Sequence, residues 1–261
     1  MKRRDFVRIG TTAALATTIT SAISHSRISA NEAPEKDGPV RVLFIHGGHG
    51  YDQEAMSRML GALPGMKVTE MEFSVAVPLL KPGLKKDFDA ILFYDYTNSD
   101  HVTKEQQRDF VELLGEGGIG VVFWHHAICT HFLDDYAIIG GRYHINAERF
   151  HGTDVPASTW KEGVDIPVQI ANQEHPITRG IEPFTIHDEA YGGVTVNPSV
   201  DVLLTADHPE CSEPFLWTHT SGKSRVVYLM PGHGKACWDH PVFPELLSRC
   251  LLWSLRGKIE D

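Results

Sequence analysis

The order of apolar and polar positions predicts the secondary-structure elements of this chain. Unbroken apolar runs are typical of strands that are buried on both faces, and shorter mixed or alternating runs are typical of strands with one exposed face. Two strand-like runs, one before and one after Ser221-Gly222-Lys223, are typical of a hairpin. The strands predicted in this way lie at residues 42–45, 67–73, 88–96, 119–127, 164–171, 201–206, 215–219 and 225–230.

Amphipathic patterns predict three helices, at 53–63, 104–114 and 243–255. Thr103 is expected to cap the second helix, with Gln106 at the capping-box position. In the first half of the chain the elements follow the order β-α-β-β-α-β, which requires a mostly parallel sheet with helices on both faces. The fold class is therefore α/β.

The first thirty residues are expected to be a targeting segment and not part of the fold. Arg3 and Arg4 are followed by Phe6 and by an apolar stretch, 9–23, that is too short for a stable membrane span. This pattern resembles a twin-arginine signal, so we expect a periplasmic or otherwise exported protein without a membrane span in its mature form. The alternative is a basic N-terminus that arose by chance.

Residues 31–39 are expected to form a polar linker and residues 40–256 a single domain. The formal net charge is −10, and residues 1–30 hold five of the 24 basic residues but one of the 34 acidic residues. Such an acidic body argues against nucleic-acid binding. No G-x-G-x-x-G motif follows a predicted strand and no Walker A motif is present, so no nucleotide cofactor is expected. The oligomeric state is left open, a homo-oligomer included.

The four cysteines, Cys129, Cys211, Cys237 and Cys250, form no C-x-x-C pair. Export would permit disulfides, but their pairing cannot be assigned from the sequence, and a cysteine-based zinc site is not expected at these spacings. Cys250 lies in an apolar helical pattern and is expected to be buried. Cys129 does not lie at a sharp strand-to-helix turn, the elbow at which a nucleophile is exposed, and no G-x-S-x-G motif provides a serine nucleophile.

Histidines and acids follow several of the predicted strands. Because the carboxyl ends of parallel strands meet at one edge of a sheet, where ligands bind in α/β folds, these side chains are expected to converge. The alternative is a set of tight turns with incidental histidines. The residues expected to converge are His46, His49, His125, His126, His187, Asp188 and His233.

Histidines and carboxylates together indicate acid–base chemistry, with or without a divalent metal such as zinc. Glu189 and Tyr191 extend the group around His187. The residues predicted to be catalytic are His125, His126, His187, Asp188 and Glu189. The residues predicted to hold a metal are His46, His49 and His233.

Four segments carry a resemblance to a known family: 44–49, 124–127, 187–191, and 222–228 with the following Gly232-His233. Together they resemble the ThuA-like (trehalose-utilisation) family over about residues 40–256. The resemblance implies a three-layer α/β/α sandwich with a flavodoxin-like sheet, as in class I glutamine amidotransferases. In those enzymes a cysteine occupies the elbow after a strand, and here His125-His126 stands at the comparable place, so amidotransferase activity is not expected.

The family is linked to the use of trehalose and related, 3-keto, glucosides. The resemblance therefore implies a carbohydrate substrate, processed by elimination or hydrolysis. Carboxylates and aromatic rings bind polyols, so Tyr94, Asp95, Trp124 and Tyr191 are predicted to contact the sugar, although core packing is the alternative for each aromatic residue. Two other functions compete: a sugar-binding protein without catalysis, and a metal-dependent hydrolase of a non-sugar substrate.

Overall fold

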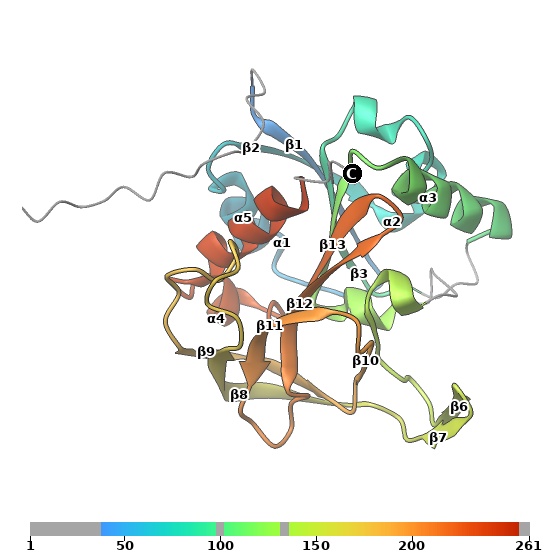
Figure 1. The fold of residues 1–261 in the computed structure, drawn as a ribbon. Coiled ribbons are helices and arrows are strands. Elements are labelled where there is room, and N and C mark those ends of the chain that lie inside the picture. The colour runs from blue at the N-terminus through green and yellow to red at the C-terminus, as the bar shows by residue number, and fades with distance from the viewer. Residues whose placement is uncertain (1–37, 98–101, 131–135, 256–261) are drawn as a thin grey trace, which may run out of the picture. The chain divides into compact units, whose positions relative to one another are not determined.

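The computed structural model describes residues 38–97, 102–130 and 136–255. The expected signal segment and most of the expected linker lie outside these residues. Within them, one sheet of nine strands has the order β2-β1-β3-β4-β13-β12-β11-β8-β9 (Figure 1). Its strands are β1 Val40–Gly47, β2 Met66–Glu72, β3 Ala90–Asp95, β4 Gly120–Trp124, β8 Thr159–Ile170, β9 Phe184–Gly192, β11 Asp201–Ala206, β12 Pro214–Ser221 and β13 Ser224–Leu229.

The first five strands in that order, from β2 to β13, are parallel to one another. Numbered among themselves they follow 2-1-3-4-5, which is the flavodoxin-like order. The apolar runs that predicted β1, β3 and β4 are buried throughout, as their lack of polar alternation requires. The predicted flavodoxin-like sheet is confirmed in this half of the molecule.

The other half of the sheet is antiparallel. β12 and β13 form the predicted hairpin, and a hairpin turn of this length can join only antiparallel strands. β11 then pairs with β12 and β8, and β8 pairs with β9 at the end of the sheet. The strand predicted at 201–206 is β11, and the one predicted at 164–171 is part of the longer β8.

Helices cover both faces of the parallel half and so give the predicted three layers. Phe110 of α3 (Lys104–Glu116) packs on Phe93, with ring centroids 5.8 Å apart, and Phe243 of α5 (Phe243–Ser254) packs on Trp124 at 5.7 Å. Phe93 is in register with Phe123, so these two side chains point to the same face of the sheet, whereas Trp124, the next residue, points to the opposite face. α3 and α5 therefore cover opposite faces of the sheet. The helices are α1 Gln53–Gly61, α2 Phe73–Ala76, α3 Lys104–Glu116, α4 Lys235–Trp238 and α5 Phe243–Ser254.

The predicted capping box of α3 is confirmed. The Thr103 hydroxyl accepts the Gln106 N–H at 3.2 Å, and the Gln106 side chain accepts the Thr103 N–H at 2.8 Å. These bonds satisfy two of the N–H groups that a helix leaves unpaired at its start. No helix in the described part of the chain is long and apolar enough to cross a membrane.

Smaller elements join these layers. After β4 comes the 3₁₀ turn His125–Cys129, and two short antiparallel pairs follow: β6 Glu148–Phe150 with β7 Thr153–Val155, and β5 Gly141–Arg142 with β10 Thr195–Val196. The carboxyl ends of β1, β3, β4 and β13 lie at one edge of the sheet because these strands are parallel. This edge carries most of the polar residues predicted to form the site.

Candidate active site

His125 stands at a sharp turn directly after β4. Its backbone φ is +53°, a conformation that non-glycine residues adopt at a cost of about 1–3 kcal/mol and that clusters at functional sites. The ring is fully buried, with Nδ1 2.8 Å from the Met230 carbonyl oxygen, and the Tyr228 hydroxyl donates to the His125 carbonyl at 3.1 Å. In α/β-hydrolases the nucleophile occupies such a strand-to-helix turn. In this protein an imidazole occupies the turn after β4.

Glu189 from β9 and His233 from the loop after β13 meet His125, and we refer to these three residues as the elbow cluster. Glu189 Oε2 lies 3.2 Å from His125 Nε2 and 3.3 Å from His233 Nδ1. The two imidazole nitrogens are themselves 3.3 Å apart. Three segments that are distant in the sequence thus deliver ionisable groups to a single point.

Two further histidines and a tyrosine surround the elbow cluster. The Tyr191 hydroxyl lies 3.1 Å from His125 Nε2. The ring of His49 is 5.4 Å from that of His233 and 5.0 Å from that of His126, between centroids. His126 is buried, whereas His49 is exposed. His49 is therefore the imidazole that a molecule arriving from solvent would meet first.

Asp188, the residue before Glu189, fixes the loop that carries His233. Its carboxylate accepts the backbone N–H groups of Gly232 and His233, the second at 3.0 Å. Adjacent residues of a strand point in opposite directions, so Asp188 clamps the loop backbone while Glu189 contacts the imidazoles. Asp188 was predicted to be catalytic, and its contacts here are those of a positioning residue.

Buried aromatic residues hold the same loop from the other side. The Trp124 indole N–H donates to the Pro231 carbonyl at 2.7 Å, and the Tyr94 hydroxyl donates to the Gly232 carbonyl at 2.9 Å. Trp124 and Tyr94 are 0% and 1% exposed. Both were predicted to contact a sugar, but neither presents a free ring face to solvent, because the fold uses them to support the loop.

Burial and mutual contact set the charge of the site. Burial favours a raised pKa for Glu189, but hydrogen bonds with His125 and His233 outweigh it and hold the pKa well below its usual range. The same carboxylate raises the pKa of His233, against the effect of burial. Burial lowers the pKa of His126 well below its usual value, and the neighbouring histidines lower it further. The site therefore holds an ionised carboxylate between imidazoles, beside a neutral His126.

Asp95, another predicted sugar contact, is also fully buried. One carboxylate oxygen accepts the Thr97 and Thr130 hydroxyls at 2.6 and 2.8 Å, and the other has no hydrogen-bond partner among the described residues. Burial raises the pKa of Asp95 to about 6, although the two hydroxyls oppose the shift. Ionised Asp95 is thus a source of instability in the native state.

Replacing Asp95 by asparagine is expected to stabilise the protein at pH 8 and to have little stabilising effect at pH 4. The native pKa lies above the unfolded value of about 3.8, so the penalty of the charged form is absent below that pH and complete above about pH 6. A shift of about two pKa units corresponds to about 3 kcal/mol. Thermal unfolding at both pH values measures this difference, and an equal effect at pH 4 and pH 8 would contradict it.

Two predicted members of the site lie elsewhere. His46 Nε2 faces Glu70 Oε1 at 3.3 Å, and His187 Nδ1 faces Asp165 Oδ1 at 2.8 Å on a side chain that is 53% exposed. Neither ring takes part in the elbow cluster. The predicted metal group is therefore corrected: among the described residues, the group of three potential ligands that comes together is His125, Glu189 and His233, and not His46, His49 and His233.

Glu162 is a neighbour of the site that the sequence interpretation missed. Its Oε1 lies 3.6 Å from His233 Nε2, the nitrogen that points away from the elbow cluster. The pairing of β8 with β9 shifts register between Lys161 and Val164, and Gly163 has a φ of +65°. A glycine inside a strand pattern is a signal for such a bulge, and bulges often occur next to active sites.

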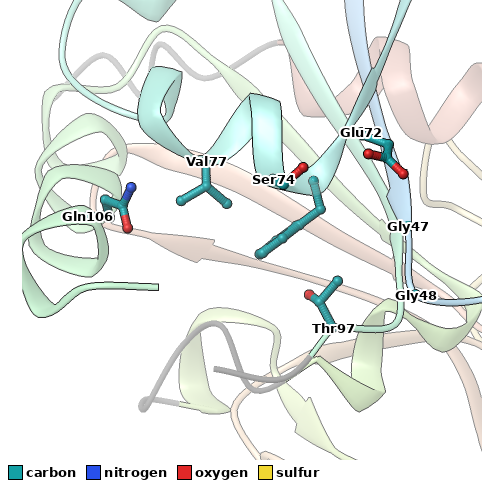
Figure 2. A pocket seen from close by; sticks show the side chains of 8 residues that line it. Gly47, Gly48, Glu72, Ser74, Val77, Thr97 and Gln106 are labelled. Atoms are coloured by element: carbon teal, nitrogen blue, oxygen red, sulfur yellow. The ribbon is translucent and has the colours of Figure 1, made fainter. Parts of the chain in front are cut away.

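A cavity of about 210 Å³ lies at the carboxyl ends of β1 and β3, where the order of the parallel strands reverses. Figure 2 shows Glu72, Thr97 and Gln106 around it, and the ring of Phe73 also lines it. Gly48 lines the cavity too, and the next residue is His49. The loop after β1 therefore connects the cavity with the elbow cluster.

Replacing Cys129 by serine is expected to leave most of the activity intact. Cys129 ends the turn that begins at His125, is 5% exposed, and has its pKa raised well above the usual value by burial, so it is a neutral thiol. All four cysteines are free. Turnover by the Cys129→Ser variant is the measurement. A loss of about a thousandfold or more with intact folding, as a removed nucleophile would give, would show that the thiol takes part in the reaction.

Comparison with known proteins agrees with this architecture. A family model described as ThuA, trehalose utilisation, matches residues 41–254. A ThuA-like protein from Parabacteroides merdae is similar with a TM-score of 0.67 at 19% identity, over 86% of this chain and 92% of that chain. PurLQS from Thermotoga maritima is similar with a TM-score of 0.51 at 14% identity, over 82% of this chain and 99% of that chain. Among curated proteins none matches. The neighbours include glutamine amidotransferase-like folds, which confirms the predicted fold class.

Proposed function

This chain belongs to the ThuA family of trehalose-utilisation proteins, and we propose that it is an exported enzyme that processes trehalose-like glucosides or their 3-keto derivatives. The observation that carries the proposal is the elbow cluster, with the exposed His49 beside it. Imidazoles and a carboxylate at this spacing suit acid–base catalysis. Because His125 stands at the elbow, where a thiol nucleophile would have to stand, the proposed reaction is not that of a glutamine amidotransferase.

The proposed reaction is a β-elimination on the 3-keto glucoside. The carbonyl at C3 acidifies the hydrogen on C2, and the glycosidic oxygen lies on C1. A base takes the C2 proton, the electron pair forms a C1–C2 double bond through an enolate, and the C1–O bond breaks. The leaving sugar oxygen then takes up a proton, so the step requires one base, one acid and a group that stabilises the enolate oxygen.

His49 is assigned the proton transfer from C2, because its imidazole is the exposed one beside the cluster. It accepts the C2 proton, and water supplies the proton to the leaving oxygen, which departs from the opposite face of an α-glucoside ring. The elbow cluster is assigned to the enolate oxygen through His233, because the Glu189 carboxylate raises the pKa of this ring and the protonated ring can donate to that oxygen. The cavity next to Gly48 offers the polar side chains of Glu72, Ser74 and Thr97 to sugar hydroxyls.

Incubation of the purified protein with trehalose and with 3-keto-trehalose tests this function. We expect free glucose and an unsaturated keto sugar from the oxidised disaccharide, detected by NMR, and no product from trehalose. His49→Ala is expected to lower this turnover, whereas His208→Ala, a histidine in the loop between β11 and β12, serves as the control. An oxidised disaccharide that stays intact would contradict the proposal. Binding of either sugar without turnover would favour a sugar-binding protein.

Export is proposed from Arg3 and Arg4, which lie outside the described residues. Replacing both by lysine is expected to leave the precursor in the cytoplasm, because the twin-arginine pathway reads the arginine pair. Cell fractionation with detection of the full-length chain measures the effect. Export that continues unchanged in the double variant would rule out this route.

A further inference from the structure

We propose that the elbow cluster is a binding site for one divalent transition-metal ion, with zinc as the best-fitting ion. His125 Nε2, Glu189 Oε2 and His233 Nδ1 are the ligands. The proposal deepens the proposed function, because a metal ion would supply the electrophile for the enolate oxygen. Metal binding itself requires no sugar and is measured separately.

The spacing of the three atoms fits a tetrahedral ion. They form a triangle with sides of 3.2, 3.3 and 3.3 Å. Ligands 2.0–2.1 Å from a tetrahedral zinc ion are about 3.3–3.4 Å apart, whereas neighbouring ligands of an octahedral ion at the same distance are about 2.9 Å apart. An ion above the triangle can therefore reach all three atoms once the Tyr191 hydroxyl, 3.1 Å from His125 Nε2, turns away from that nitrogen.

In their neutral forms the two histidines can present lone pairs to the centre of the triangle. His125 Nδ1 is 2.8 Å from the Met230 carbonyl, which can only accept, so the ring proton is on Nδ1 and the lone pair is on Nε2. His233 Nε2 faces the Glu162 carboxylate at 3.6 Å, which favours the proton on Nε2 and the lone pair on Nδ1. A backbone carbonyl and a carboxylate are the partners that orient histidine ligands in metal sites.

In the metal-free protein these three atoms can lie within 3.3 Å of one another because protons lie between them, as in the hydrogen bonds of Glu189 with His125 and His233. A divalent ion satisfies all three at once. Two histidines and a glutamate are also the ligand set of a class of catalytic zinc sites that leave the fourth position to water or substrate.

Other histidine–carboxylate contacts in the described chain lack the third ligand. His144 meets Glu148 at 2.7 Å, but its second ring nitrogen contacts the Thr195 hydroxyl. His187 meets Asp165 on the exposed surface. These pairs are ordinary ion-pair or hydrogen-bond contacts, and they provide matched controls for the elbow cluster.

Calorimetric titration of the full chain, purified without a histidine tag and stripped with chelator, tests the site. We expect the protein to take up one equivalent of Zn²⁺, and one equivalent of Co²⁺ with visible absorption bands of a tetrahedral complex. Glu189→Gln and His233→Ala are expected to abolish this binding, and Glu148→Gln and His187→Ala are expected to retain it. Glu162 is 61% exposed, so Glu162→Gln should fold normally and weaken binding by about tenfold or more.

Absence of stoichiometric Zn²⁺ and Co²⁺ binding by the wild-type chain would overturn the metal site. Wild-type affinity in folded Glu189→Gln or His233→Ala, or equal losses in the two control variants, would overturn the ligand assignment. These measurements contain no sugar. Metal binding without turnover of the keto disaccharide would therefore contradict the proposed function alone, and turnover without metal binding would contradict this inference alone.

Discussion

Replacing Glu189 by glutamine is expected to remove nearly all turnover of the keto disaccharide. Glu189 contacts the ring nitrogens of both histidines of the elbow cluster, and its side chain is only 8% exposed. Loss of one group that stabilises charge in the transition state lowers the turnover rate by about a hundredfold to a thousandfold. The rate under saturating substrate is the measurement.

The pKa of His233 gives a second measurement on Glu189→Gln, independent of substrate. The carboxylate raises that pKa, so it is expected to fall in the variant, as NMR titration of the metal-stripped protein can show. Glu148→Gln is the matched control, because Glu148 also contacts a buried histidine, His144, outside the elbow cluster. Turnover within tenfold of wild type in correctly folded Glu189→Gln would contradict the assignment.

Replacing Gly232 by alanine is expected to displace His233 and to destabilise the protein. Gly232 has a φ of +152°, and an added Cβ would lie 1.9 Å from Nε1 of Trp124. Trp124 cannot yield, because it is fully buried and its indole N–H holds the Pro231 carbonyl. Overpacking and backbone strain each cost about 1–3 kcal/mol. A shift of about 1 Å in a catalytic group can lower the rate by about a hundredfold.

Gly234→Ala is the control for this prediction. Gly234 lies in the same loop, and an added Cβ there would meet no atom within 4 Å. Thermal unfolding and turnover of both variants provide the comparison. A loss of about 3 kcal/mol would lower the melting temperature of a domain of this size by about 6–12 °C. If Gly232→Ala kept both wild-type stability and wild-type rate, the loop would not require this glycine.

The parallel half of the fold was predictable from local pattern. Runs such as 42–45 and 119–124 are apolar at every position, and each appears as a strand buried on both faces. The helix from Lys104 began at its predicted cap for an equally local reason, the pairing of Thr103 with Gln106. Local pattern also placed His125 at the end of β4, although its φ could not be inferred.

The composition of the elbow cluster was only partly predictable. Glu189 and His233 were named as candidates, but their contact with His125 depends on the path of β9, which belongs to the antiparallel half of the sheet. His187 and Glu189 lie on the same face of β9 by alternation, yet His187 is exposed and Glu189 is buried. Alternation along β9 therefore could not show that Glu189 belongs to the elbow cluster and that His187 does not.

Similarly, the roles of Trp124 and Tyr94 depended on contacts over long sequence distances. Their polar atoms reach a loop more than a hundred residues later in the chain. An aromatic residue after a strand looks the same in a sequence whether it stacks on a ligand or supports a loop. Only the three-dimensional arrangement distinguishes these alternatives.

The position of β9 at the end of the sheet has a consequence for how the protein would lose activity on warming. Among the described strands β9 pairs only with β8, and it supplies both Glu189 and the Asp188 clamp. Terminal strands open with less free energy than central ones. Fraying of this single strand would move Glu189 away from His125 and His233 while the parallel half of the sheet stayed folded. Inactivation would then precede global melting, and amide hydrogens of β9 would exchange faster than those of β4.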